Sequence, residues 1–391
     1  MREGWINKKI GDVCQVSAGQ GAPQGEDRYS DVGTPFVKAG NLVELINGKQ
    51  ESDIQKVSDE VAKAHRLVLY KTGSVVFAKS GMSCMKGHVY TLKNDCYVVS
   101  HLAILQPRNI SSAYLNYYLQ HHKPNNLIKD EGYPSISLKD IENSIISIPS
   151  NIEQENRVVS ELDKINELIR LKKEQLKDYE NLAQSIFYEM FGDPVENKKG
   201  WEERTMQDLC VNIVDCPHST PKKVDYITDY PCIRTSELRG GSISWATMQY
   251  LDEDEYNIRI ARLKPEAGDI VFGREGTIGD AVILPLGYNF SLGQRTMLLR
   301  ADTSIVSNIF LHRIILSDWI KHQIEYVNVS STVAHVNIRD FKKFTVPLPP
   351  LQLQQVFASR ITQIEALKAE VQRTIKDLET LLASRMQYWF D

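Results

Sequence analysis

The sequence predicts an α+β protein in which two similar, strand-rich mixed α/β domains are separated by two long helices. Three observations lead to this fold class. The chain repeats itself after about half its length, each copy contains short β-branched and aromatic runs, and each copy ends in a long apolar heptad pattern. With 391 residues, the chain is long enough for two or three domains that each bury a core of their own.

The repeat defines the domains. Gly4-Trp5 recurs as Gly200-Trp201, and the later matches keep the same order along the chain. They are TPFVK (34–38) with YPCIR (230–234), KTGSVVFAKSG (71–81) with PEAGDIVFGREG (265–276), and SISLKDIENSIISIPS (135–150) with HVNIRDFKKFTVPLPP (335–350). The predicted division is therefore a first domain, a first spacer helix, a second domain and a second spacer helix, at residues 1–150, 151–191, 192–350 and 351–391.

Each domain is expected to be built mainly of strands. Its short runs of Val, Ile, Phe and Tyr are broken by Gly, Pro, Asn and Asp, which is typical of strands joined by turns. A proline exit, Ile148-Pro149 in the first copy and Leu348-Pro349-Pro350 in the second, separates the last strand from the helix. Proline lacks a backbone donor and disfavours helix at the residue before it, so a boundary is expected there.

The two helices carry the clearest periodicity in the chain. Their apolar residues alternate in steps of three and four, which keeps one stripe facing a partner helix, and one lysine interrupts each stripe, Lys172 or Lys368. A simpler alternative is that each helix packs only on its own domain. Two helices of similar length most simply pair with each other as an antiparallel coiled coil, giving a dumbbell with a pseudo-two-fold axis. The stripes are Val158, Leu162, Ile165, Ile169, Leu176, Tyr179, Ala183 and Ile186, then Phe357, Ile361, Ile364, Val371, Ile375, Leu378 and Leu382.

Composition excludes several classes of protein. With 42% hydrophobic residues, no apolar run of membrane-spanning length and no signal-peptide core, the chain is expected to be cytoplasmic and away from membranes. The six cysteines form no CxxC pair, and Cys216, His218 and Cys232 lack an evident fourth ligand, so free thiols are expected and no metal site. The net charge of -4 means that any contact with nucleic acid is local or shared with a more basic partner.

Two similar modules related by a pseudo-two-fold axis suit a ligand that itself repeats, and duplex DNA is such a ligand. Half-sites one helical turn apart lie about 34 to 36 Å from centre to centre. A helix of the predicted length, rising about 1.5 Å per residue, could impose that separation. Because the two domains differ in sequence, they would read different half-sites.

The same motifs resemble a known family over essentially the whole chain. GDIVFGREGTIGDAVILP (268–285), SLGQRTMLLR (291–300) and STVAHVNIRDFKKFTVPLPPLQLQQVF (331–357) resemble the specificity subunit of Type I restriction-modification systems. The first half repeats them more loosely as TGSVVFAKSGMSCMKGHVY (72–90), VVSHLAIL (98–105) and PSISLKDIENSIISIPSNIEQE (134–155). The halves depart from each other at the shorter first proline exit and at the residues after the VVFA and IVFG runs.

This resemblance implies a function and a set of partners. Each domain would be a target recognition domain, the helices would be spacers, and the chain would be a non-catalytic subunit that recognises a bipartite, gapped DNA target. It would direct adenine methylation and restriction by two methyltransferase subunits and two restriction/translocase subunits. S-adenosylmethionine would be bound by the methyltransferase subunits and ATP by the restriction subunits, with no cofactor on this chain.

Candidate DNA contacts follow three strand-like runs at matching places in both halves. Arg and Lys pair with guanine edges and Asn and Gln with adenine edges, while phosphate contacts supply position. The alternatives are ordinary hairpins with surface charges, and a structural hydrogen bond for His101. The candidates are Lys38 and Asn41 with Arg234, Thr235 and Ser236; Lys79, Ser80 and Gly81 with Arg274, Glu275, Gly276 and Thr277; and Ser100 and His101 with Gln294 and Arg295. Weaker candidates for phosphate contacts are Lys86, His88, Tyr133, Lys139, His335 and Arg339.

Two rival functions are less consistent with the sequence. An enzyme of this kind would need machinery such as an Asn/Asp-Pro-Pro-aromatic stretch, a GxxxxGK[ST] loop or a GxGxxG loop, and the sequence contains none of them. A non-catalytic coiled-coil scaffold for protein interactions fits the helices and the acidic charge. It leaves unexplained the matched polar residues that follow the strands of both domains.

Overall fold

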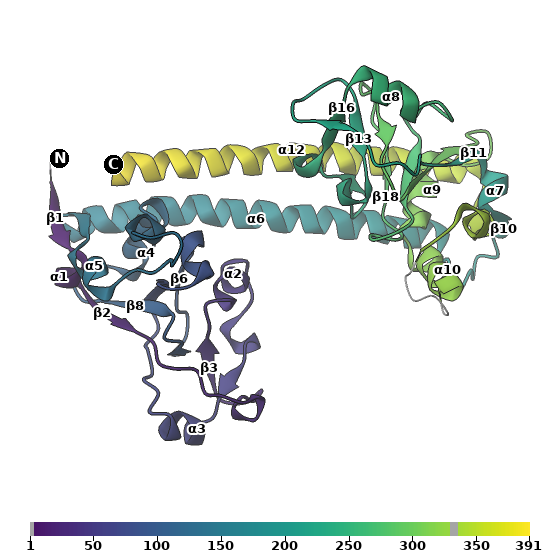
Figure 1. Cartoon of the computed structure of the whole chain (residues 1–391). Coiled ribbons are helices and arrows are strands. Elements are labelled where there is room, and N and C mark those ends of the chain that lie inside the picture. Colours follow the sequence, from purple (N-terminus) through teal and green to yellow (C-terminus); the bar gives the residue numbers. More distant parts are fainter. Residues whose placement is uncertain (1–3, 329–334) are drawn as a thin grey trace. The chain divides into compact units, whose positions relative to one another are not determined.

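The computed structural model describes residues 4–328 and 335–391, so residues 331–334 of the quoted 331–357 motif lie outside the described residues. The chain forms two compact units. The first unit is Met1–Lys173 with Arg373–Asp391, and the second unit is Glu174–Gln372. Each unit combines one globular domain with parts of both long helices, α6 (Ile152–Phe191) and α12 (Leu351–Phe390) (Figure 1).

The first domain is built on an antiparallel four-stranded sheet of order β2-β8-β5-β6, beside a smaller sheet of order β4-β3-β7 in which β3 and β7 are parallel. The pair β1-β9 closes the domain next to α6. Its strands are β1 Trp5–Lys9, β2 Cys14–Ala18, β3 Thr34–Val37, β4 Lys56–Val57, β5 Val75–Ala78, β6 Val89–Thr91, β7 Tyr97–Val98, β8 Leu102–Pro107 and β9 Ile145–Pro149. Its helices are α1 Ile10–Val13, α2 Asn41–Ile46, α3 Asp59–Ala64, α4 Ser112–His121 and α5 Leu138–Asn143.

The second domain repeats the main sheet, and it adds one strand to the second sheet and a separate pair, β14-β15. Its main sheet has the order β11-β20-β17-β18, its second sheet has the order β12-β16-β13-β19 with β13 and β19 parallel, and β10-β21 corresponds to β1-β9. Its strands are β10 Glu202–Thr205, β11 Cys210–Asp215, β12 Lys223–Val224, β13 Pro231–Ile233, β14 Leu238–Arg239, β15 Ser242–Ile243, β16 Gln249–Leu251, β17 Ile270–Gly273, β18 Ala281–Ile283, β19 Ser291–Leu292, β20 Thr296–Ala301 and β21 Thr345–Leu348. Its helices are α7 Met206–Leu209, α8 Glu253–Arg259, α9 Asn308–Ile315, α10 Asp318–Asn328 and α11 Ile338–Phe341.

The strand cores explain why these runs form sheets. Val75, Val76 and Phe77 of β5 are almost fully buried, as are Ile270 and Val271 of β17, so these central strands read as continuous apolar runs. The short helices α5 and α11 each start at a residue whose side chain caps the helix. Ser137 accepts a hydrogen bond from the backbone of Asp140, and Asn337 accepts one from Asp340, which is the usual way to satisfy the first free donors of a helix.

The apolar stripes of α6 and α12 face each other within each unit. In the first unit, Glu161 pairs with Arg385, and Lys173 Nζ lies 3.0 Å from Glu379 Oε1, so α6 and α12 run antiparallel. In the second unit, the stripe residue Lys368 donates to Glu180 Oε2 of α6 at 2.9 Å. Val158, Leu162, Phe357 and the other apolar stripe residues are buried or partly buried. These contacts confirm the predicted pairing of the helices, and Lys368 has an acidic partner at its polar position in the stripe.

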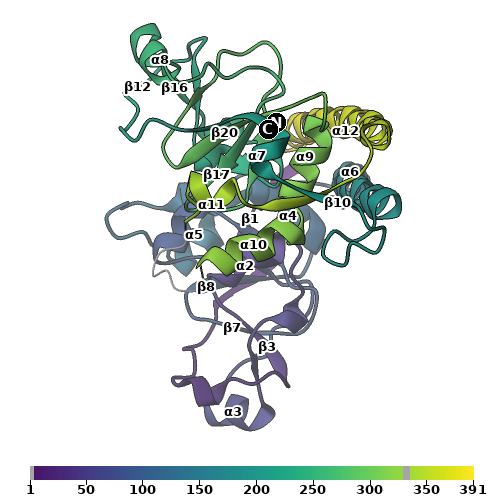
Figure 2. The same ribbon diagram turned by 90° about the vertical axis from the view of Figure 1, so that its right-hand side faces the viewer.

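The start of α6 and the end of α12 belong to the core of the first domain, and the start of α12 and the end of α6 belong to the core of the second. A buried first-turn side chain anchors the start, since Glu155 Oε1 accepts from the backbone of Ser111 at 2.7 Å and Gln354 Oε1 accepts from Ser307 at 2.8 Å. The last turn of α12 adds Met386, Trp389 and Phe390 to the core of the first domain, and the last turn of α6 adds Phe187 and Phe191 to that of the second. Figure 2 shows α9 beside α12 in the second unit, where Phe310 lies in the same core as Phe357.

Two general properties follow from the described residues. No helix in these ranges combines the length and the apolar character needed to cross a membrane.

The six cysteines are free thiols, as expected, and all but Cys210 are buried. Burial raises the pKa of the Cys14 thiol to about 12 and that of the Cys232 thiol to about 11, so neither is a reactive thiolate at neutral pH.

Candidate nucleic-acid interface

Two of the predicted groups of the first domain meet at one place. Lys79 follows β5, and its backbone N donates to the carbonyl of His101, which lies between β7 and β8, at 2.9 Å. The carbonyl of Lys79 accepts from Ile136 at 2.8 Å, and Ser80 forms a β-bridge with Ser135. We call Lys79, Ser80, His101 and Ser135 the first cluster. It joins three segments that are far apart in the sequence.

The second domain has the same backbone arrangement with different residues. Arg274, after β17, donates from its backbone N to the carbonyl of Arg295 at 2.9 Å, and its own carbonyl accepts from Val336 at 3.0 Å. Glu275 forms a β-bridge with His335. We call Arg274, Glu275, Arg295 and His335 the second cluster. Each backbone contact of the first cluster therefore has a counterpart in the second.

The side chains on these two matching frames differ in chemistry. In the first cluster, Ser80 Oγ and His101 Nδ1 form a hydrogen bond of 2.9 Å. In the second, Arg295 Nε lies 3.2 Å from Glu275 Oε2, and the Arg295 side chain is 63% exposed. An exposed pair of this kind contributes little to stability and can be exchanged for another partner. Three residues of the second cluster, Arg274, Glu275 and Arg295, also line a small pocket of about 180 Å³ with Cys216, His218 and Gln294.

Arg274 is bound inside the protein. Its guanidinium pairs with the carboxylate of Asp215 at the end of β11, and only 12% of the Arg274 side chain is exposed. Asp215 also lies 3.4 Å from His218 Nε2, and the carbonyl of His218 accepts from Gln294 Nε2 at 2.7 Å. Arg274 thus orders the loops around the second cluster. Its counterpart Lys79 pairs with no carboxylate among the described residues.

The candidates after β3 and β13 are largely engaged in local contacts. Lys38 Nζ donates to Gln55 Oε1 at 2.7 Å and lies over the ring of Tyr29, while Asn41 Oδ1 accepts from the Lys38 backbone at 2.9 Å. Arg234 Nη2 donates to the fully buried carboxylate of Glu237 at 2.7 Å. These residues shape the loops and expose few free donors.

In the second domain this group is connected to the loop that follows β17. The hydroxyl of Thr277 donates to the carbonyl of Thr235 at 3.1 Å, and the hydroxyl of Ser236 donates to Glu237 Oε1 at 2.8 Å. Gly276, directly before Thr277, adopts a φ of +76°, a conformation that favours glycine. Gly81 in the first domain has the same φ. The turns after β5 and β17 therefore share a glycine with the same φ.

The remaining candidates lie at the edges of these clusters. Tyr133 is 80% exposed and precedes Pro134, whose carbonyl accepts from Gly81 at 3.1 Å. Lys139 on α5 and Arg339 on α11 are exposed at matching positions. Lys86 and His88 lie before β6, where Lys86 is exposed and His88 is partly exposed. Among the described residues, neither of them forms a hydrogen bond with the first cluster.

Several residues around the two clusters were not predicted from the sequence. Asp215, His218 and Glu237 are acidic or aromatic neighbours of the predicted arginines, and Ser135 completes the first cluster. Their role depends on pairing between strands that are distant in the sequence. The one available signal was the match between Ser135 and His335 in the repeated segment.

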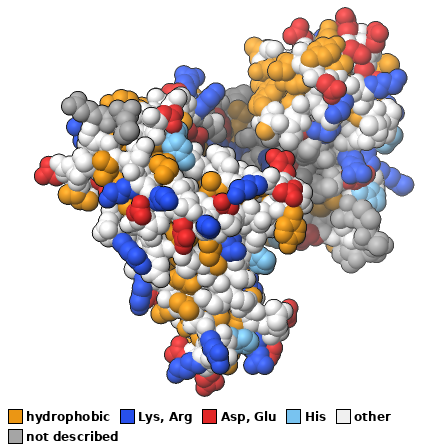
Figure 3. All heavy atoms as spheres, turned by 60° about the vertical axis from the view of Figure 1, so that its left-hand side comes forward, with side chains coloured by type: hydrophobic (Ala, Val, Ile, Leu, Met, Phe, Trp, Pro, Cys, Tyr) orange, Lys and Arg blue, Asp and Glu red, His pale blue; other side chains and the backbone are white. Residues whose placement is uncertain are grey.

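The surface charge agrees with local rather than bulk contact with a polyanion. On the face shown in Figure 3, Lys and Arg side chains are interspersed with Asp and Glu. The formal net charge is -4. Any attraction to phosphates on this face therefore depends on individual side chains.

Comparison with known proteins assigns the family. The sequence model of the family described as "Type I restriction modification DNA specificity domain" matches residues 2–179 and 198–380, once for each half of the repeat. The chain belongs to this family, and it is a specificity subunit that has no catalytic role of its own.

Similar proteins carry related names. The "Putative type I restriction enzyme MjaX specificity subunit" of Methanocaldococcus jannaschii is 20% identical over 394 residues, covering 96% of this chain and 90% of that protein. The MjaIX specificity subunit of the same organism is 28% identical over 151 residues, and that match spans 38% of this chain and only 34% of the relative's length.

Two solved structures share the fold. The specificity subunit of the Type I restriction-modification system of M. genitalium aligns with a TM-score of 0.59 at 10% identity, covering 99% of this chain and 96% of that one. A chain from a study of complex assembly and conformational transition of the type I R-M system aligns with a TM-score of 0.53 at 16% identity, covering 99% and 97%. At these identities the likeness is one of fold, and it confirms the predicted class of two mixed domains with long helices.

Proposed function

We propose that this chain recognises a bipartite, gapped DNA target, with one part read by each domain. It directs adenine methylation by two methyltransferase subunits and cleavage by two restriction/translocase subunits. S-adenosylmethionine is bound by the methyltransferase subunits and ATP by the restriction subunits, and this chain supplies sequence recognition.

The observation that supports this proposal most strongly is the pair of matching clusters. The same backbone contacts recur around Lys79 and around Arg274, yet the first frame presents Ser80 and His101 where the second presents Glu275 and Arg295. A constant frame with exchanged polar side chains is what two readers of different sequences require. A protein-only scaffold has no need for this arrangement twice.

The side chains of the second cluster suit the edges of bases. Arg295 is the accessible arginine, and a guanidinium donates two parallel hydrogen bonds to the O6 and N7 atoms of guanine. Glu275 can accept from the N4 amino group of cytosine, which is the partner of guanine in the same base pair. In the first cluster, the Ser80 hydroxyl and the His101 imidazole can each donate or accept, so they suit a different base pair.

The long helices act in this proposal as spacers between the two half-sites. Each has 40 residues, which corresponds to about 60 Å at about 1.5 Å per residue. Their paired stripes make them stiffer than a flexible linker, so the helix length would set the gap in the target.

The test compares methylated adenines across the genome of the host with and without this gene. We expect a two-part motif with an unspecified gap to be methylated in the parent strain and unmethylated in the deletion strain. Restoring the gene on a plasmid should restore the motif. A methylation pattern that is identical in both strains would contradict the proposal.

A further inference from the structure

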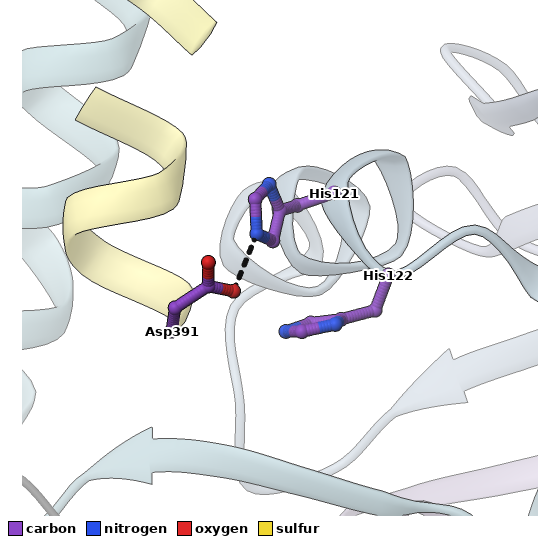
Figure 4. A group of neighbouring side chains, drawn as sticks. All are labelled: His121, His122 and Asp391. Carbon is purple, nitrogen blue, oxygen red and sulfur yellow. Dashed lines mark hydrogen bonds and ion pairs between the residues drawn. The ribbon is translucent and has the colours of Figure 1, made fainter. Parts of the chain in front are cut away.

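Two adjacent histidines and an aspartate meet at the end of α12 in the first unit. His121 is the last residue of α4, His122 follows it, and Asp391 follows the last turn of α12. Figure 4 shows the His121 ring directed toward the Asp391 carboxylate and the His122 ring beside them. No metal site was expected from the sequence, and no local pattern could reveal this group because His121 and Asp391 are 270 positions apart.

The geometry places three good ligand atoms together. His121 Nε2 lies 2.8 Å from Asp391 Oδ1, and one ligand atom from each of the three residues lies within 4.8 Å of the others. His122 Nε2 also lies 3.2 Å from the carbonyl oxygen of Phe390. The His121 side chain is 22% exposed and that of Asp391 is 52% exposed, so water can reach the group.

We propose that His121, His122 and Asp391 form a binding site for a divalent transition-metal ion such as Zn²⁺. Two imidazole nitrogens and one carboxylate oxygen are a common donor set for this ion, and three protein ligands leave a fourth tetrahedral position for water. Softer thiol ligands are not part of the group, which favours Zn²⁺, Co²⁺ or Ni²⁺ over Cu⁺.

An ordinary ion pair accounts for only part of this arrangement. An ion pair with Asp391 needs one histidine, and His121 supplies it, whereas His122 brings a second imidazole ligand atom within 4.8 Å of the other two while its Nε2 contacts the Phe390 carbonyl. Zn–N bonds of about 2.0 to 2.1 Å in a tetrahedron place ligand atoms about 3.3 Å apart. Coordination would require rotation of the exposed Asp391 side chain, and the His122 Nε2 would have to exchange the Phe390 carbonyl for the ion.

Neighbouring contacts hold the ligands near each other before any ion binds. The ring of Phe390 packs edge-on against Tyr114 and Tyr118 of α4, with centroid distances of 5.4 and 5.7 Å, and Trp389 stacks on Trp5 at 6.5 Å. The ion would therefore link the last turn of α12 to α4. It would stabilise the first unit by mass action, since the unfolded chain does not bring these residues together.

The test uses the full-length chain without a polyhistidine tag, because a tag would bind the same ions. Calorimetric titration with Zn²⁺, and with Co²⁺ followed by its visible absorption, should show one site per chain. His122→Gln and Asp391→Asn should each weaken binding by more than about tenfold. The matched control is His322→Gln, since His322 is an exposed histidine on α10 in the second unit and should leave binding unchanged.

Thermal unfolding provides a second readout that also reports on folding. Zn²⁺ should raise the unfolding temperature of the wild type and of the control variant, and should raise that of Asp391→Asn much less. The Asp391→Asn side chain keeps its shape and an acceptor oxygen, so this variant should fold without metal. Absence of stoichiometric binding by the wild type would show that the three residues form an ion pair only. Equal binding by the wild type and both variants would place the ion elsewhere on the chain. Either result would overturn the proposal.

Discussion

Arg274 and Arg295 are neighbours in the second cluster, yet their surroundings differ. Arg274 is 12% exposed and paired with Asp215, whereas Arg295 is 63% exposed and its partner Glu275 lies at the surface. Breaking a buried charge pair leaves a charge that is poorly solvated, while loss of a surface pair costs little stability. We therefore expect Arg274 to order the loops, and we propose Arg295 as the residue that contacts DNA.

Replacement of Arg295 by alanine should weaken binding of the assembled methyltransferase to its DNA site by about 1 to 3 kcal/mol, because a bidentate contact to one base pair is lost. Affinity measured on the cognate duplex and on a duplex altered in one half-site checks this. The matched control is Arg204→Ala, since Arg204 on β10 also forms an exposed pair with a glutamate.

Arg274→Ala separates the two roles. It should lower the unfolding temperature of the protein, because Asp215 is left partly buried without its partner, whereas Arg295→Ala should leave that temperature nearly unchanged. An Arg295→Ala protein that binds cognate DNA as tightly as the wild type, with the same salt dependence, would remove Arg295 from the interface.

His312 on α9 gives the second domain a pH-dependent stability. Its side chain is buried and its Nε2 lies 2.9 Å from the carbonyl of Ala281. Burial lowers the pKa of His312 from 6.5 to about 4, so the folded protein keeps this ring neutral while the unfolded chain takes up a proton. The stability is complete above pH 6.5 and should fall as the pH decreases from 6.5 to about 4.

Unfolding temperatures of the wild type and of His312→Gln across that pH range measure this effect. The glutamine amide can still donate to Ala281, and it has no proton to gain, so the variant should lose less stability on acidification. The control is His322→Gln, because His322 is exposed. Parallel pH profiles for all three proteins would contradict the assignment to His312.

At the scale of elements, the sequence predicted what depends on local pattern. The stripe of α12, including the polar position of Lys368, and the strands before Lys79 and Arg274 were correctly predicted, because periodicity and buried apolar runs are local signals. The bonds from Lys79 to His101 and from Arg274 to Asp215 were not predicted. They arise from pairing of strands distant in the sequence, and no local pattern encodes them.

The end of α12 shows the same limit. Trp389 and Phe390 were expected only to continue the spacer helix, but they belong to the core of the first domain together with Trp5 and Tyr114. A heptad pattern indicates which face of a helix is apolar. It does not indicate whether that face meets a helix, a sheet or both.

The spacer role of α6 and α12 predicts a change in the target when both are shortened. Removal of residues 167–173 and 373–379 deletes one heptad from each helix, and these segments face each other because Lys173 pairs with Glu379. The rise of about 10 Å that is lost corresponds to about three base pairs. Mapping of methylated adenines should show a shorter gap or loss of methylation, and an unchanged gap would contradict the spacer role.

At the scale of the whole molecule, the two copies of the duplicated domain share a backbone arrangement and differ in the side chains of the two clusters. The main sheets of both domains have matching strand orders, and the contacts around the turn after the central strand are the same, while Ser80 and His101 are replaced by Glu275 and Arg295. The sequence was sufficient to detect the duplication and to place candidates in both copies. It could not rank them, because ranking requires exposure and partners, which separate Arg295 from Arg274.

The central claim is that each domain reads its own part of the DNA target, and the most direct measurement is the methylated motif in strains that carry altered clusters. One strain carries Arg295→Gln and the other Ser80→Ala, each as the sole copy of the gene. We predict that Arg295→Gln relaxes or changes one half of the motif, that Ser80→Ala affects the opposite half, and that the gap stays the same in both. Methylation retained with both halves unchanged in both strains, or a single variant that alters both halves together, would contradict the account.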